Sequence, residues 1–348
     1  MDRRGFLQVS SLMGMGIWAL KSGYPQTVSN QGNVMTVLGP ISQGDLGSTL
    51  SHEHVLVDFI GAEQVSRDRY DAIEAYEVIL PYLQKVKDLG CRGFVECTPA
   101  YLGRDPLLLK HLAETTELHI LINTGYYGAA NDKFIPSYAY QETADQLSDR
   151  WYKEWLEGIE GTGIRPGFIK TGVDAGPLSE IDRKLVQAAA RTHARTGLTI
   201  ASHTGNTRAA LDQFEILAEE GVKSDAFIWV HAQSDWELKS RLDAAQKGVW
   251  IEIDNIDTGS VSECVSRVNS LKQRGYLNRI LVSHDAGWYK PGEPKGGSFR
   301  GFETAYTAFL PALRRAGWTE DEIHQLIVTN PAAAFTVRIR KNTSSSLF

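Results

Sequence analysis

The sequence has little cysteine, no excess of positive charge and no long apolar run, and each shortage excludes a class of protein. Only 3 of its 348 residues are cysteine, too few for a disulfide framework, so we expect free buried thiols. Lysine and arginine total 36 against 42 acidic residues, a net charge of −6. Nucleic acid is therefore not expected as a partner, because phosphate binding needs a basic face.

The N-terminal 33 residues form a region of their own. Arg3 and Arg4 precede an apolar segment, Val9–Leu20, which is shorter than the roughly 20 residues that a membrane span needs. This pattern resembles a twin-arginine export signal followed by a polar linker, residues 21–33. We expect an exported, periplasmic protein without a stable membrane span. A frayed amphipathic N-terminus is the alternative.

Residues 34–340 alternate between short apolar runs and amphipathic helical segments, which predicts a parallel α/β fold. The eight runs are Thr49–Asp58, Gly93–Cys97, Ile120–Tyr127, Pro166–Val173, Thr199–Gly205, Phe227–Ala232, Val249–Asp254 and Ile280–Asp285. Eight strand–helix units favour a (β/α)8 TIM barrel over an open, doubly wound sheet. No G-x-G-x-x-G follows the first run, so a dinucleotide site is not expected.

Local signals mark the edges of this barrel. A short N-terminal β-hairpin with Gly39-Pro40 at its turn is expected to cover the barrel floor. Ser179 begins a helix that Gly197 ends, and Asn330-Pro331 is expected to end the last helix. The Ser-rich residues 341–348 are expected to form a disordered tail.

Six residues at or near the ends of the apolar runs point to a metal site: His52, His54, Lys170, His203, His231 and Asp285. Residues two apart in a strand point to the same face, so His52 and His54 can reach one metal from inside the barrel. Active sites of such barrels lie at the C-terminal ends of the strands. Imidazole and carboxylate groups gathered there predict a metal-dependent hydrolase, in which Asp285 can bind metal and accept a proton.

Lys170 is the unusual member of this set. It ends an otherwise apolar strand, where burial of an ammonium group is costly. Two neighbouring divalent cations would repel an ammonium, whereas a carbamate formed with CO2 would be anionic and could bridge both ions. The alternative is a lysine that reaches out to solvent.

These residues and their neighbours resemble the phosphotriesterase family of the amidohydrolase superfamily, which includes phosphotriesterase-related proteins and lactonases. The resemblance covers Val37 to Phe335. The motifs that carry it are Ser51-His-Glu-His54, Gly167-Phe-Ile-Lys170, Ser202-His-Thr204, Val230-His231, Ser283-His-Asp285 and Val328-Thr-Asn-Pro331.

The resemblance implies a binuclear metal centre in the barrel. By this resemblance His52, His54 and Asp285 would hold the more buried ion, and His203 and His231 the more exposed one. Carboxylated Lys170 and a hydroxide would bridge the two ions. The hydroxide would attack a carbonyl or phosphoryl centre, and Asp285 would take the proton. Zinc is the default metal for this ligand set, although Mn, Co or Fe could bind the same ligands.

Residues around the strand ends bear on the substrate. The resemblance aligns Tyr127 with a tyrosine of the lactonases, where efficient organophosphate hydrolases carry tryptophan; packing at the rim is the alternative. It aligns Asn255 with an arginine of homoserine-lactone hydrolases and with the relay histidine of phosphotriesterases. In the glycine-rich loop 286–300, Trp288 could stack on a substrate, and Lys290 and Arg300 could recognise an anionic one, unless the loop is merely solvated.

The sequence therefore predicts a binuclear-metal hydrolase that acts on a small carboxylic ester, with a lactone favoured and phosphotriester hydrolysis as a side activity. A phosphodiesterase for an anionic metabolite and a non-catalytic barrel-fold binding protein are the alternatives. A mononuclear deaminase is disfavoured because a site with one metal does not need Lys170. A homodimer is compatible with the sequence.

Overall fold

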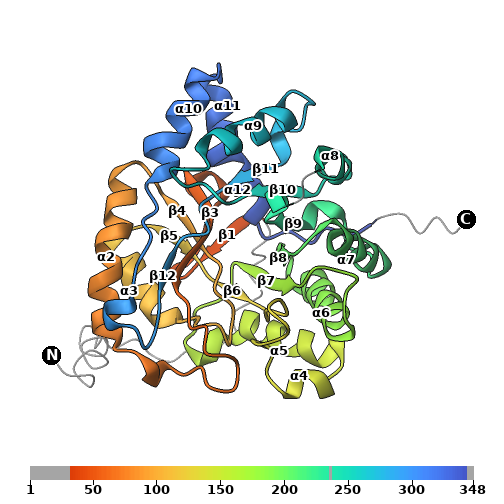
Figure 1. Ribbon diagram of the computed structural model, residues 1–348. Helices are drawn as coiled ribbons and strands as arrows, with labels where there is room; N and C mark the ends of the chain where they lie inside the picture. Colours follow the sequence, from red (N-terminus) through yellow and green to blue (C-terminus); the bar gives the residue numbers. More distant parts are fainter. Residues whose placement is uncertain (1–31, 235–236, 343–348) are drawn as a thin grey trace, which may run out of the picture.

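The computed structural model describes residues 32–234 and 237–342. Parallel strands lie at the centre and helices surround them (Figure 1), which is the arrangement expected for a (β/α)8 barrel. The predicted export signal and nearly all of its linker, residues 1–31, lie outside the described residues. Residues 343–348 of the predicted tail lie outside them as well.

The strands of the barrel follow the eight apolar runs. They are β3 (Thr49–Leu56), β4 (Gly93–Glu96), β5 (His119–Leu121) continued by β6 (Asn123–Thr124), β7 (Phe168–Val173), β8 (Ile200–Thr204), β9 (Phe227–Val230), β10 (Trp250–Ile253) and β11 (Ile280–Val282). Hydrogen-bonded neighbours run in order from β3 through β4 to β5, and from β6 through β7, β8, β9 and β10 to β11. At the remaining seam, the Asp285 amide donates to the His52 carbonyl at 3.1 Å. A short strand, β12 (Gly287–Tyr289), also pairs with β3.

Helices cover the outside of the barrel. They are α2 (Ala72–Asp88), α3 (Pro106–Thr116), α4 (Tyr138–Gln141), α5 (Ala144–Glu157), α6 (Glu180–Thr196), α7 (Thr207–Glu219), α8 (Leu238–Gln246), α9 (Val261–Lys272), α10 (Leu310–Arg315), α11 (Glu320–His324) and α12 (Asn330–Phe335). The predicted ends of α6 are confirmed: the Ser179 side chain accepts from the Asp182 amide, and Gly197 ends the helix in the left-handed conformation.

Apolar side chains form two cores because alternate residues of each strand face opposite sides. One large cluster fills the layer between strands and helices. A second cluster fills the barrel interior, with Phe168, Ile228 and Trp250 among its members. Ala332 and Phe335 of α12 join this second cluster and close its base. In the described part of the chain, the cavity of the barrel therefore opens at the C-terminal ends of the strands.

The predicted hairpin is present, but its turn is not at Gly39-Pro40. Strand β1 (Asn33–Thr36) pairs antiparallel with β2 (Gly39–Ser42), and Met35 lies opposite Pro40. The turn is Val37-Leu38, where the Thr36 hydroxyl donates to the Gly39 carbonyl and accepts from the Leu38 amide. Proline is tolerated in β2 because this strand has a neighbour on one side only. The Val37 amide binds the Ile120 carbonyl and anchors the hairpin to the barrel.

The prediction that Asn330-Pro331 ends the last helix is wrong. A π-helical turn, Gln325–Thr329, leads directly into α12, and Pro331 lies in the first turn of that helix. The amide that proline lacks is not needed in a first helical turn, and the widened π turn accommodates the proline ring. Asn330 also has a tertiary role, since its side-chain amide donates to the carbonyls of Leu277 and Ile280.

The first two residues of the predicted tail, Lys341 and Asn342, make backbone contacts with the rest of the chain. Lys341 forms a β-bridge with Val222, and the Asn342 amide binds the Gly221 carbonyl at 3.0 Å. All three cysteines are free and buried, as predicted. Within the described residues, no helix combines the length and apolar character required to cross a membrane.

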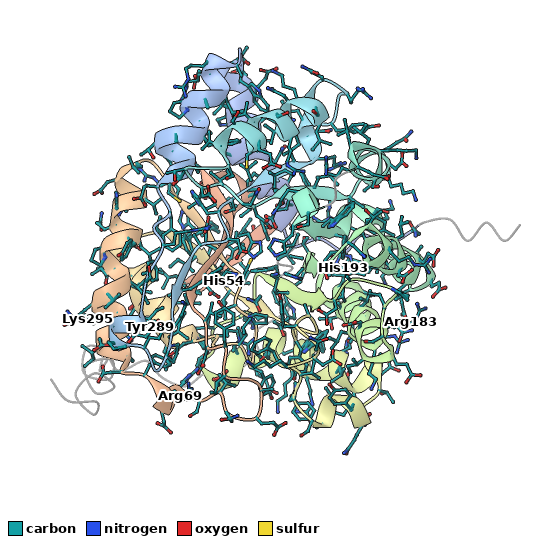
Figure 2. The ribbon with its side chains drawn as sticks, viewed as in Figure 1. His54, Arg69, Arg183, His193, Tyr289 and Lys295 are labelled. Carbon is teal, nitrogen blue, oxygen red and sulfur yellow. The ribbon has the colours of Figure 1, made fainter. Side chains whose placement is uncertain are left out.

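His193 shows how a buried histidine can stabilise this barrel without binding metal. It lies on α6, apart from His54 at the centre (Figure 2). Its Nδ1 donates to the Leu198 carbonyl at 2.8 Å, and its Nε2 accepts from the Arg340 amide at 3.0 Å. Protonation would destroy that acceptor. Burial is the main cause that lowers the pKa of His193 from 6.5 to about 4.

This pKa predicts a pH-dependent contribution to stability. The contribution of neutral His193 is complete above pH 6.5 and is lost as the pH falls from 6.5 to about 4, at most about 3 kcal/mol. In urea titrations, the difference in free energy of unfolding between the wild type and His193→Gln should shrink as the pH falls over this range. A difference that stays constant with pH would contradict the assignment.

Candidate functional site

The six candidate ligands lie together. All of them line one cavity of about 310 Å³ at the C-terminal end of the barrel. The imidazole centroids of His203 and His231 are 4.4 Å apart, and those of His52 and His231 are 5.1 Å apart. Residues from strand ends more than 230 positions apart in the sequence thus share one site, as the barrel geometry requires.

The alternation of β3 separates the two histidines from the glutamate between them. His52 and His54 face the cavity, whereas Glu53 is fully buried on the other side of the strand. Glu53 accepts hydrogen bonds from the His284 ring, the Ser283 hydroxyl and the Ala286 amide, and so ties β3 to the loop after β11. Glu53 and His284 therefore contact each other on the side of β3 that faces away from the candidate ligands.

Two of the candidate ligands sit in strained backbone. His231 follows β9 with a φ of 61°, and Asp285 follows β11 with a φ of 52°. Residues other than glycine seldom adopt this left-handed conformation, which is enriched at functional sites. The turn it produces lets both side chains line the cavity immediately after their strands end.

Three of the candidate ligands converge closely enough to hold one cation. His52, His54 and Asp285 each offer an atom, and these atoms all lie within 4.8 Å of one another. An Asp285 carboxylate oxygen is 3.1 Å from His54 Nε2 and 3.8 Å from His52 Nε2. This arrangement agrees with the set that the family resemblance assigns to the more buried ion.

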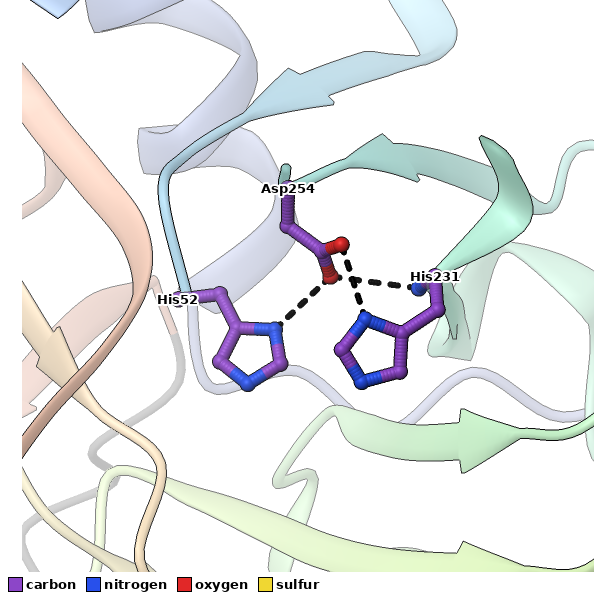
Figure 3. Close-up of side chains that lie close together, drawn as sticks. All are labelled: His52, His231 and Asp254. Carbon is purple, nitrogen blue, oxygen red and sulfur yellow. Dashed lines mark hydrogen bonds and ion pairs between the residues drawn. The ribbon is translucent and has the colours of Figure 1, made fainter. Parts of the chain in front are cut away.

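Asp254 joins two histidines from opposite parts of the sequence (Figure 3). One carboxylate oxygen accepts from His52 Nδ1 and the other from His231 Nδ1, both at 2.8 Å. The His231 amide and the Gln233 side chain donate to the same carboxylate. These bonds occupy the Nδ1 atoms and leave each Nε2 free for the cavity, so Asp254 is an orienting residue rather than a ligand.

His54 is oriented by a second hydrogen-bonded chain. Its Nδ1 donates to the Thr98 hydroxyl at 2.9 Å, and this hydroxyl donates to Glu96 at 2.5 Å. Glu96 also accepts from the amides of Val55 and Thr98. Burial raises the pKa of Glu96 to about 7, although each of these hydrogen bonds lowers it. The chain fixes the tautomer of His54 and directs Nε2 toward Asp285.

The surroundings of the cavity lower the pKa of both His203 and Asp285, for different reasons. Burial, then the neighbouring His231 and Lys170, holds the pKa of His203 well below its usual value, so the ring is a neutral potential ligand. Burial would raise the pKa of Asp285, but the nearby imidazoles lower it further than burial raises it. The carboxylate of Asp285 therefore stays ionised at neutral pH.

Lys170 is the most unusual group in the cavity. It lies on β7, where its side chain is only 1% exposed. Among the described residues its ammonium forms no ion pair, and Nζ lies 5.9 Å from the centroid of the Tyr127 ring. A buried, unpaired ammonium is costly, so this site suits a modified lysine better than a free one.

Tyr127 and Trp288 line the cavity, as their predicted role in substrate binding requires. The other three predicted substrate residues do not line it. Asn255 binds Ser260 and Cys264, and Lys290 pairs with Glu293 at 3.7 Å. The exposed Arg300 donates to the backbone carbonyls of His284 and Asp285, so its guanidinium supports the loop after β11.

Sequence reasoning missed several residues of this site. Asp254, Thr98 and Glu96 orient the ligands, while Phe59 and Phe134 complete an aromatic wall with Tyr127 and Trp288. Asp254 could have been found, since it ends the seventh apolar run in the position that the ligands occupy in theirs. The two phenylalanines lie in loops, and no periodic pattern in the sequence marks them.

Comparisons with known proteins identify the family of this chain. The model of the phosphotriesterase family matches residues 32–335. A phosphotriesterase homology protein of Escherichia coli is 27% identical, over 83% of this chain and 98% of the relative. A human N-acetyltaurine hydrolase is 28% identical, over 89% of this chain and 99% of the relative. The structure of a mutant organophosphorus hydrolase from Deinococcus radiodurans matches with a TM-score of 0.78 and 28% identity. The match covers 88% of this chain and 98% of that structure's chain. The chain belongs to the phosphotriesterase family.

Proposed function

We propose that this protein is a hydrolase that uses two divalent cations to attack an ester carbonyl, and that its natural substrate is a lactone. One observation carries the proposal. Four imidazoles, the Asp285 carboxylate and the buried, unpaired Lys170 line a single cavity. Each group alone could be structural, but together they form the donor set of a binuclear metal site.

The residues present fit two cations. His52, His54 and Asp285 would hold one ion, and His203 and His231 the other, with Lys170 between them as a carbamate. A carbamate would remove the cost of the buried ammonium and would supply two oxygens that share one negative charge. Nitrogen and oxygen donors of this kind suit Zn²⁺, although Mn, Co and Fe accept them too. Divalent cations in such a site lower the pKa of water and supply a nucleophile at neutral pH.

The surrounding residues position the ligands and move the proton. Asp254 and Thr98 fix the tautomers of His52, His231 and His54, which leaves the three Nε2 atoms available to cations. Asp285 is the one carboxylate among the described residues that line the cavity. Because it is ionised at neutral pH, Asp285 is the residue that can accept the proton of the attacking water.

The cavity wall favours a compact substrate with an apolar part. Val57, Phe59, Leu102, Phe134 and Trp288 line it together with Tyr127, and a volume of about 310 Å³ suits a small molecule. The ring or acyl part of a lactone would pack against this wall. N-acetyltaurine hydrolases, named for the hydrolysis of an amide, are among the relatives, which supports attack at a carbonyl carbon. Amide hydrolysis is accordingly a second candidate activity.

The metal and the lysine can be tested together. Wild-type protein loaded with Zn²⁺ or Mn²⁺ should hold about two ions per chain by elemental analysis and lose activity to a chelator. Lys170→Ala should be inactive, because the bridging anion is lost, and a short carboxylic acid in the buffer should partly restore activity. Full activity in Lys170→Ala would contradict the bridge. Fewer than two ions, without activity on reloading, would favour the non-catalytic alternative.

A separate prediction concerns Asp254. Asp254→Asn should lower metal affinity or kcat/KM by about 10- to 100-fold, because an amide cannot accept from both histidine rings as a carboxylate does. Metal affinity is measured by competition with a chelator. Asp257→Asn is the matched control, since Asp257 caps only the amides of Gly259 and Ser260 in the same loop. Equal effects of the two substitutions would exclude an orienting role for Asp254.

The substrate class follows from a kinetic panel. On metal-loaded enzyme, kcat/KM for lactones should exceed kcat/KM for phosphotriesters and phosphodiesters. The apolar wall and the position of Tyr127 support this order. Faster hydrolysis of phosphodiesters than of lactones would overturn the choice of substrate while leaving the metal site intact.

A further inference from the structure

We infer that the substrate carries a carboxylate or similar oxyanion away from its scissile carbonyl, and that Lys133 binds this group at the mouth of the cavity. The inference deepens the proposed function and rests on it. Lys133 and Lys170 are the two lysines that line the cavity, and no arginine lines it among the described residues. Lys170 is buried at the base, whereas Lys133 is exposed, which places Lys133 at the open end.

The charge of Lys133 is not neutralised by the protein. In the described parts of the chain its ammonium forms no ion pair or hydrogen bond, and its aromatic neighbour is Phe134, with 5.8 Å between Nζ and the ring centroid. Other cationic side chains around the strand ends already form ion pairs with acidic residues. Arg69 pairs with Asp58 at 2.6 Å, and Lys290 pairs with Glu293. Lys133 is thus a free cation beside an apolar wall.

The loop that carries Lys133 has a defined backbone conformation that hydrogen bonds stabilise. Three consecutive residues, Ala130–Asp132, have φ values of 64°, 54° and 60°, a conformation that costs roughly 1–2 kcal/mol per residue. Asp174 compensates part of this cost, since its carboxylate accepts from the Ala130 and Asn131 amides at 2.8 Å each. Backbone held in this way is characteristic of ligand-binding segments.

The loop after β3 holds Lys133 from the other side. The Ala62 amide donates to the Lys133 carbonyl at 3.0 Å. Gly61 has a φ of 114°, and a Cβ at that position would lie 3.5 Å from Lys133 Cγ and 3.6 Å from Cε. The aliphatic stem of Lys133 therefore lies against the backbone of Gly61. This contact limits where the ammonium can go and keeps it at the cavity.

An oxyanion fits this position for electrostatic reasons. An ammonium at the edge of an apolar wall attracts an anion more strongly than it would in bulk water, and the resulting hydrogen bond is charge-assisted. A neutral substrate would gain nothing from Lys133. The expected substrate therefore has an apolar or ring part against Phe134 and Trp288, a carbonyl above the candidate ligands and an anionic group at Lys133.

Two matched probes test the inference. The first is a γ-butyrolactone with a carboxylate on its γ carbon, compared with the corresponding neutral carboxamide. Wild-type, metal-loaded enzyme should prefer the carboxylate by roughly tenfold in kcat/KM, as expected for one charge-assisted contact. Lys133→Met should abolish the preference for the carboxylate over the carboxamide. Lys133→Arg should retain much of it, and Lys133→Glu should reverse it.

The control is Lys110→Met, the same change at a lysine on α3 that lies 3.9 Å from Glu114 and does not line the cavity. It should keep the wild-type preference. A preference that survives in Lys133→Met would overturn the inference.

A binding measurement separates this inference from the proposed function. If no lactone is hydrolysed, the proposed function fails, but the binding of 4-acetamidobutanoate and 4-acetamidobutanamide can still be followed by tryptophan fluorescence on metal-loaded protein. The ratio of the affinity for the carboxylate to the affinity for the amide should be roughly tenfold higher in wild type than in Lys133→Met. Any contact of the carboxylate with the metals is common to both proteins. Equal ratios in the two proteins would therefore exclude Lys133 as the anion site.

Discussion

The carboxylate of Asp254 holds together the parts of the chain that make the candidate site. Its two oxygens bind His52, on the first barrel strand, and His231, at the end of the sixth. Both histidines are thereby fixed in one tautomer with Nε2 toward the cavity. A buried carboxylate is costly unless it is satisfied, and here four donors satisfy it. The arrangement of the candidate ligands depends on this contact.

The barrel interior explains why the site lies where it does. Apolar side chains fill the lower part, and α12 closes the base, so charged groups can be accommodated only at the open end. The strain at His231 and Asp285 belongs to this end as well. Stability is thus concentrated in the packed interior, and strained or unpaired groups such as Lys170 and Lys133 gather around the cavity.

The shape of the cavity is set largely by residues outside the eight barrel strands. The barrel strands and the residues that follow them supply the candidate metal ligands, while Phe59, Phe134 and Trp288 set the shape of the cavity. The loop after β11 was expected to supply the cationic residues, but Lys290 and Arg300 contact other parts of the protein. The free cation at the cavity comes instead from the loop after β6, at Lys133.

The sequence by itself determined the alternating fold and the six candidate ligands, because strand periodicity and strand ends are local patterns that place residues on one face and at one edge. It also determined that Lys170 was anomalous, since an ammonium in an apolar strand is costly wherever the strand lies. Tertiary structure decided the rest. Asp254 and Thr98 act on histidines distant in the sequence, and the hairpin turn, the continuation through Pro331 and the position of Lys133 depend on contacts between segments that no local pattern records.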